Sequence, residues 1–84
     1  MTRGECREII VRCIKEIVGN DDLPSQIEDD YNLIKAGVVD SLKFVKLVLL
    51  IEDKCGIKLE LEKLSNEEFG TVRGFIMLLA KGIE

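Results

Sequence analysis

The sequence predicts a small all-α protein, a bundle of three main helices and one short helix with a long loop between the first two main helices. Two observations support this fold class. Apolar side chains recur every three or four residues in separate stretches, as on the buried face of an amphipathic helix. The one short stretch that alternates like a strand, around residues 57–61, has no partner strand. We expect a single domain over residues 1–84.

The first helix is expected over about residues 3–18, and Gly19 is placed to end it as a C-cap. The loop that follows, residues 19–40, contains the only proline. A loop this long is unusual, and we expect its apolar side chains to anchor it to the helices. The apolar face of the first helix consists of Cys6, Ile9, Ile10, Cys13, Ile14 and Ile17.

The second helix is expected over about residues 41–55. Asp40 and Ser41 are residue types that favour a helix N-cap, and no helix breaker follows before Gly56. Because this helix is apolar over most of its circumference, we expect it to lie at the centre of the domain.

The remaining chain is expected to form a short helix over about residues 61–66 and a last helix over about residues 71–81. Thr71 is the predicted cap of the last helix. Gly74 within it costs about 1 kcal/mol relative to alanine, so we expect this helix to be the weakest.

Composition removes several classes of function. There is no histidine, which excludes Ser-His and Cys-His catalysis and histidine-bound metals. The net charge of −4 argues against nucleic acid as the main partner. No apolar run approaches the roughly 20 residues of a membrane span, and the start lacks a signal-peptide pattern. The acids at 28–30 lack calcium-loop spacing. We expect a cytoplasmic monomer without metal, its three cysteines (Cys6, Cys13 and Cys55) reduced.

The segment Ala36–Leu42, which reads AGVVDSL, places the Ser41 hydroxyl at the start of the second helix. Unpaired N–H groups and the positive end of the helix dipole favour an attached anion such as a phosphate there. The alternative is that Asp40 or Ser41 only caps the helix. Ser41 is not expected to be a catalytic nucleophile, because the chain has no suitable base.

Four blocks of the chain, taken in order, resemble the acyl carrier protein family. They are residues 9–19, residues 33–42 (LIKAGVVDSL), residues 47–59 and residues 67–72 (EEFGTV). The resemblance covers most of the chain. The Asp-Ser-Leu motif alone is common, whereas four blocks in the right order are specific.

The resemblance implies a freestanding, specialised carrier with no catalytic activity of its own. Ser41 would accept 4′-phosphopantetheine from coenzyme A through a phosphopantetheinyl transferase. The prosthetic thiol would hold an acyl group as a thioester and present it to ligases, acyltransferases or synthases of a fatty-acid, lipid or specialised pathway. An aminoacyl or peptidyl carrier for a dedicated ligase is the alternative, and an unmodified helical interaction module is a remote one.

The second helix is also the expected recognition surface, with Asp40 and Leu42 supporting the site. On a helical wheel Leu50 falls within the polar face, whereas Val45 and Leu49 fall towards the apolar side. The lysines depart from the acidic helix of the common family members, which favours a dedicated partner over a merely solvated face. The expected recognition residues are Lys43, Val45, Lys46, Leu49 and Leu50.

A long acyl chain, if carried, is expected to insert between the second and last helices. Glu52 falls within the apolar arc, and we expect it to reach water or a base of the first helix, Arg12 or Lys15. The residues expected to line the acyl-chain pocket are Phe44, Val48, Ile51, Phe75 and Ile76.

Overall fold

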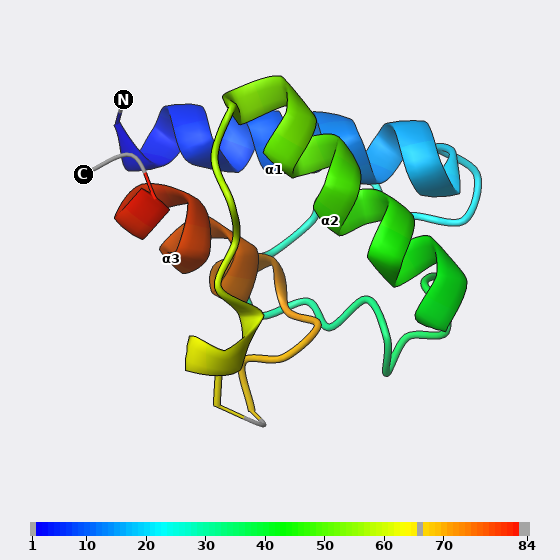
Figure 1. The fold of residues 1–84 in the computed structure, drawn as a ribbon. Coiled ribbons are helices and arrows are strands. Elements are labelled where there is room, and N and C mark those ends of the chain that lie inside the picture. The colour runs from blue at the N-terminus through cyan, green and yellow to red at the C-terminus, as the bar shows by residue number, and fades with distance from the viewer. Residues whose placement is uncertain (1, 66, 83–84) are drawn as a thin grey trace.

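The computed structural model describes residues 2–65 and 67–82 of the chain (Figure 1). The all-α class is confirmed, since these residues form helices and one isolated bridge, between Asn32 and Thr71, but no sheet. The elements are α1 (Arg3–Val18), α2 (Ser41–Cys55), the 3-10 helix η1 (Leu61–Lys63) and α3 (Val72–Gly82).

The short helix is smaller than predicted, so the bundle has three α-helices rather than four within the described residues. It is a single 3-10 turn over Leu61–Lys63, whereas a helix was predicted over about 61–66, of which residue 66 lies outside the described residues. None of its residues is buried, and its first turn has no side-chain cap. Without burial or a cap, little stabilises further turns.

The start of α1 is held by a capping box. The Glu5 N–H donates to the Thr2 hydroxyl (3.1 Å), and the Thr2 N–H donates to the Glu5 carboxylate (3.2 Å). The hydrogen bond from the Thr2 N–H to the carboxylate stabilises the charged form and lowers the pKa of Glu5. The helix ends at Gly19, which has a positive φ of 88°.

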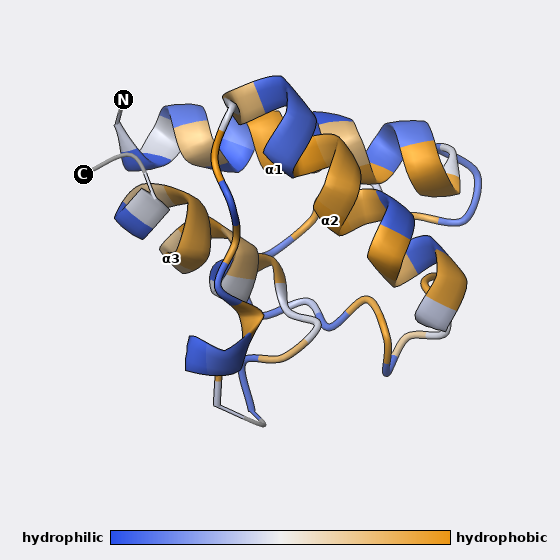
Figure 2. Ribbon diagram, in the orientation of Figure 1, coloured by the Kyte–Doolittle hydropathy of each residue, from blue (hydrophilic) through white to orange (hydrophobic). Residues whose placement is uncertain are grey.

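The helices share one core, in which α1 packs against both α2 and α3. In Figure 2, α2 and α3 are apolar along most of their length, whereas α1 alternates between apolar and polar residues. The buried residues of α2 and α3 are Phe44, Leu47, Val48, Ile51, Val72, Gly74, Phe75, Ile76, Leu78 and Leu79.

The long loop is bound to the start of α3 by backbone hydrogen bonds. The Leu33 N–H donates to the Gly70 carbonyl (2.9 Å), and the Arg73 N–H donates to the Asp29 carbonyl (2.7 Å). The Asp29 carboxylate forms an ion pair with Arg7 of α1 (3.1 Å). The acidic cluster at 28–30 therefore has a structural role through Asp29, while Glu28 is exposed.

Gly74 has a packing role that its helix propensity does not reveal. It is buried, and a Cβ at this position would lie 2.5 Å from the Glu68 carbonyl oxygen. Thr71 caps α3 as predicted, since its hydroxyl accepts the Gly74 N–H (3.0 Å). The glycine thus allows the chain before α3 to approach the helix closely.

The cysteines are free, with Cys6 and Cys13 buried and Cys55 partly buried. Burial raises the pKa of the Cys13 and Cys55 thiols. Among the described residues, no group of acidic, cysteine or histidine side chains is arranged to hold a metal ion. None of the helices in the described part of the chain is long and apolar enough to cross a membrane.

Candidate functional site

Ser41 is the first residue of α2 and its side chain is exposed. The cap is provided by the residue before it, because the Asp40 carboxylate accepts the Lys43 N–H (2.9 Å). The Asp40 carbonyl also accepts the Phe44 N–H (2.8 Å), the first bond of the helix. The Ser41 hydroxyl is therefore not needed as the cap, and its side chain is exposed.

The chain before Ser41 is held by a tight turn around Leu33. The N–H groups of Val38 and Val39 both donate to the Leu33 carbonyl (3.2 Å each), and Gly37 supplies the positive φ of 79°. The side chains of Leu33 and Val39 are buried in the core. Both the turn and the helix thus fix the backbone on the two sides of Ser41.

A pocket of about 270 Å³ lies beside Ser41. Its walls are largely apolar, and the Phe44 ring within it lies 4.9 Å from the Phe69 ring and 5.6 Å from the Phe75 ring. The lining residues are Ile34, Asp40, Ser41, Phe44, Val45 and Phe69.

Ile34 and Phe69 were not among the residues predicted for the site. They come next to Ser41 only because the long loop packs against the segment before α3. The contact is made by Asn32, whose side-chain amide donates to the Phe69 carbonyl (3.2 Å). No local sequence pattern signals such a long-range contact.

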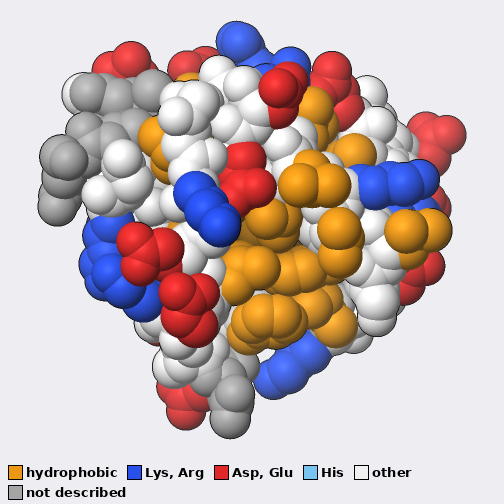
Figure 3. All heavy atoms as spheres, viewed as in Figure 1, with side chains coloured by type: hydrophobic (Ala, Val, Ile, Leu, Met, Phe, Trp, Pro, Cys, Tyr) orange, Lys and Arg blue, Asp and Glu red, His pale blue; other side chains and the backbone are white. Residues whose placement is uncertain are grey.

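The exposed apolar residues of α2 differ from the single one that the helical wheel suggested. Leu42, Val45 and Leu49 are 65%, 52% and 58% exposed. Leu50 is half-buried and packs against the core. Figure 3 shows apolar side chains gathered on this face of the molecule, with both basic and acidic side chains around its edges.

The five residues predicted to line an acyl-chain pocket all belong to the hydrophobic core, where they are packed among other buried side chains. Phe44, Val48, Ile51, Phe75 and Ile76 are all 8% exposed or less. Only Phe44 also lines the pocket beside Ser41.

Glu52 is bonded differently from the prediction. Its carboxylate accepts the N–H of Leu59 (2.8 Å), which ties the end of α2 to the segment that follows. The ion pair between α2 and α1 instead joins Lys54 to Glu16 (3.5 Å). Glu52 thus meets its hydrogen-bonding need locally.

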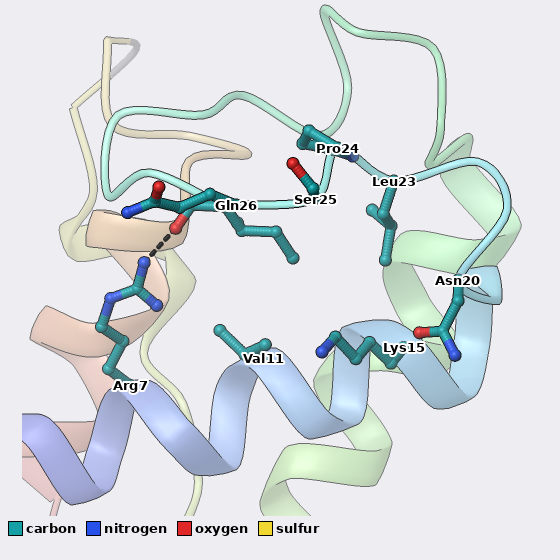
Figure 4. Close-up of a pocket in the computed structure, with 9 residues that line it drawn as sticks. Arg7, Val11, Lys15, Asn20, Leu23, Pro24, Ser25 and Gln26 are labelled. Atoms are coloured by element: carbon teal, nitrogen blue, oxygen red, sulfur yellow. Dashed lines mark hydrogen bonds between the residues drawn. The ribbon is translucent and has the colours of Figure 1, made fainter.

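A second pocket, of about 370 Å³, lies between α1 and the segment 20–27 (Figure 4). Arg7 borders it and donates a hydrogen bond to the Ile27 carbonyl, while Val11 and Lys15 line its α1 side. None of its lining residues lines the pocket beside Ser41. It holds none of the predicted site residues.

Residues 8–79 match the family described as "Phosphopantetheine attachment site". The chain belongs to this family. It is similar to the D-alanyl carrier protein of Leuconostoc citreum (strain KM20), with 29% identity over 65 residues, 77% of this chain and 80% of that protein. It is also similar to the D-alanyl carrier protein of Enterococcus faecalis (strain ATCC 700802 / V583), with 29% identity over 70 residues, 83% and 87% of the two chains. No solved structure matches the chain.

The protein is thus a carrier protein with covalently attached 4′-phosphopantetheine. The residues at the start of α2 fit this group. Ser41 offers an exposed hydroxyl, the helix N-terminus favours the charge of a phosphodiester, and the adjoining pocket has room beside it.

Proposed function

We propose that Ser41 is the attachment residue and that the protein, as a single carrier domain, presents a thioester-linked group to partner enzymes. The observation that supports this most directly is the exposed Ser41 side chain at the first position of α2, next to a separate cap on Asp40. The attached group supplies a thiol at the end of a flexible arm.

The chain's own residues position the hydroxyl and stabilise the phosphodiester. Asp40 holds the Lys43 amide, and Leu33 holds the turn before it, so the Ser41 backbone is fixed when an enzyme approaches. The first amides of a helix have no acceptor within the helix, so the amides of Ser41 and Leu42 would be available to an anion attached to the hydroxyl. The partner enzyme supplies the catalytic base, since this chain has no histidine.

The cargo that agrees best with the comparisons is an amino acid, because both similar proteins are D-alanyl carrier proteins. The partners would then be a phosphopantetheinyl transferase and an amino-acid-activating ligase in the cytoplasm. The residues predicted to receive a long acyl chain are packed together in the core, which favours a small cargo over a long fatty acid.

Intact-mass measurement after incubation with coenzyme A and a phosphopantetheinyl transferase tests the attachment site. The wild type should gain the mass of one phosphopantetheinyl group, and Ser41→Ala should gain none. Ser25→Ala, which alters an exposed serine of the long loop, is the matched control and should be modified like the wild type. An adduct on Ser41→Ala, or none on the wild type, would refute the proposal.

The cargo is tested on the modified protein with ATP and a ligase that serves a D-alanyl carrier protein. Incubation with D-alanine should add the mass of one alanyl group, and hydroxylamine should remove it, because thioesters are cleaved by this reagent. A parallel incubation with a long-chain fatty acid and an acyl ligase should add little. Loading by the fatty acid alone would contradict the aminoacyl cargo while leaving Ser41 as the attachment site.

A further inference from the structure

Two walls of the pocket beside Ser41 come from segments that are far apart in the chain. Ile34 belongs to the long loop and Phe69 to the segment before α3, and both line the pocket. They are 38% and 41% exposed, so neither wall is anchored by full burial in the core. Their positions therefore depend on the contacts that join the two segments.

Asn32 joins these segments through its side-chain amide. The amide oxygen accepts the N–H groups of Ile34 (3.0 Å) and Lys35 (2.9 Å), which holds the turn of the long loop. The amide nitrogen donates to the Phe69 carbonyl (3.2 Å). One half-buried side chain therefore fixes the backbone at both walls of the pocket.

The segments also approach each other closely at Gly70, which is buried and has a positive φ of 88°. A Cβ at this position would lie 2.9 Å from the Asn32 side-chain oxygen and 3.0 Å from Cδ1 of Ile34. The Leu33 N–H donates to the Gly70 carbonyl (2.9 Å) at the same place. The hydrogen bond from Asn32 to Phe69 is thus part of a tightly packed contact between the two segments.

The pocket between these walls suits an uncharged group better than a phosphate. The Asp40 carboxylate borders it and is negatively charged at neutral pH, so it would repel an anion placed there. A phosphate on Ser41 is therefore expected to face the free amides at the start of α2, and an apolar group attached to that phosphate suits the pocket. The apolar residues that line the pocket are Ile34, Phe44, Val45 and Phe69.

The 4′-phosphopantetheine arm has an apolar group of this kind next to its phosphate. A methylene follows the phosphate, and the next carbon carries a pair of methyl groups. Because only a few bonds join this carbon to the hydroxyl oxygen of the attachment residue, it must stay close to that residue. Ser41 itself lines the pocket, which has a volume of about 270 Å³. Contact of the methyl groups with Ile34 and Phe69 would remove apolar surface from water.

We infer that Asn32 is a positioning residue for the group carried by Ser41. By joining the long loop to Phe69, it sets the separation of the walls between which the dimethyl part of the arm rests. The contact limits the directions in which the rest of the arm leaves Ser41, while the thiol at its far end stays free to enter a partner enzyme. The inference rests on the proposed attachment at Ser41.

NMR of the ¹³C,¹⁵N-labelled full chain with an unlabelled arm tests this contact. The modified protein is prepared with coenzyme A and a phosphopantetheinyl transferase, and intact mass verifies that modification is complete. In an isotope-filtered experiment, the methyl protons of the arm should show NOEs to the Ile34 methyl groups and to the Phe69 ring.

Variants then separate the bond to Phe69 from the turn of the loop. Asn32→Asp keeps an oxygen for the N–H groups of Ile34 and Lys35 but cannot donate to the Phe69 carbonyl, so most of the NOE intensity to Phe69 should be lost. Asn32→Ser is uncharged and too short to reach Phe69, and it should show the same loss. Asn20→Asp, the same change at an exposed asparagine of the same loop, is the matched control and should keep the NOEs of the wild type. Amide shifts of the buried residues verify that each variant is folded, and Asn32→Ser decides alone if Asn32→Asp does not fold.

The absence of NOEs from the arm to both walls in the wild type would overturn the inference. Equal NOE intensities in the wild type and the folded Asn32 variants would overturn it too, as would an equal loss in Asn20→Asp. The mass assay on Ser41 separates these outcomes from the proposed function. A chain that is modified on Ser41 but shows no NOEs to the walls would keep its carrier function and lose this role of Asn32, whereas a chain that is not modified on Ser41 would refute the proposed function itself.

Discussion

Replacing Gly74 with alanine sets helix propensity against packing. In an open helix the change gains about 1 kcal/mol. Here the new Cβ would lie 2.5 Å from the Glu68 carbonyl oxygen, whereas ordinary contacts begin at 3.4 Å. The segment before α3 must move by about 1 Å, which we expect to cost about 2 kcal/mol as overpacking.

The same movement disturbs the cap of α3. The Glu68 carbonyl accepts both the Thr71 hydroxyl (2.7 Å) and the Thr71 N–H (3.0 Å), so weakening them costs about 1 kcal/mol more. The clash and the weakened bonds outweigh the propensity gain. We expect Gly74→Ala to lower the free energy of unfolding by about 2 kcal/mol, which is about 10 °C in Tm for a chain of this size.

Urea and thermal unfolding followed by circular dichroism measure this effect. Gly4→Ala is the matched control, because Gly4 is an exposed residue of α1 whose Cβ would meet only the Thr2 hydroxyl, at 3.9 Å. It should be neutral or stabilise the protein by up to about 1 kcal/mol. If Gly74→Ala also stabilised the protein, the close approach of Glu68 to α3 would be refuted.

Three further changes test the site and its supports. Asp40→Ala should lower the free energy of unfolding by about 1 kcal/mol through loss of the α2 cap, while Asp40→Asn should retain most of it. Glu52→Ala should cost about 1–2 kcal/mol because the Leu59 amide loses its charged acceptor, and Glu52→Gln should cost less. Burial raises the pKa of Cys13, so the buried neutral thiol contributes fully to the free energy of unfolding at pH values below the thiol pKa of the unfolded chain. This contribution should be lost as the pH rises through the pKa of the thiol in the folded chain. Cys13→Ala should therefore reduce the fall of the free energy of unfolding with pH in the alkaline range.

For each of these three predictions, one outcome of the same unfolding assay would contradict the reasoning. Equal stability of Asp40→Ala and the wild type would show that α2 does not depend on this cap. A Glu52→Gln variant less stable than Glu52→Ala would argue against the bond to Leu59. An unchanged alkaline slope in Cys13→Ala would show that this thiol does not contribute to the pH dependence.

The helices could be predicted from the sequence because capping and periodicity act over a few residues. Asp40 caps α2 and Thr71 caps α3, as their residue types indicated. The attachment motif could be proposed for the same reason, since Asp40 and Ser41 adjoin a helix start. The helix predicted after Leu59 is longer than the observed turn because its apolar residues, Leu61 and Leu64, are only partly buried, which leaves little to stabilise further turns.

The orientation of α2 could not be read from its pattern. A helix that is apolar around most of its circumference has no unique buried side, so the wheel gave Leu50 the exposed position that Leu42, Val45 and Leu49 occupy. Contact with α1 settles which side faces the core. The formation of α2 depends on residues close together in the chain, whereas its rotation about its own axis depends on contacts with α1.

By itself, the sequence determined the helical class, the caps and a serine at a helix start, because each depends on residues close together in the chain. Only the tertiary structure decided what surrounds that serine. Phe69 reaches the Ser41 pocket, Glu68 approaches Gly74 and the long loop pairs with the start of α3 through contacts between distant residues. Such contacts follow from how the whole core packs, and no short stretch of sequence specifies them.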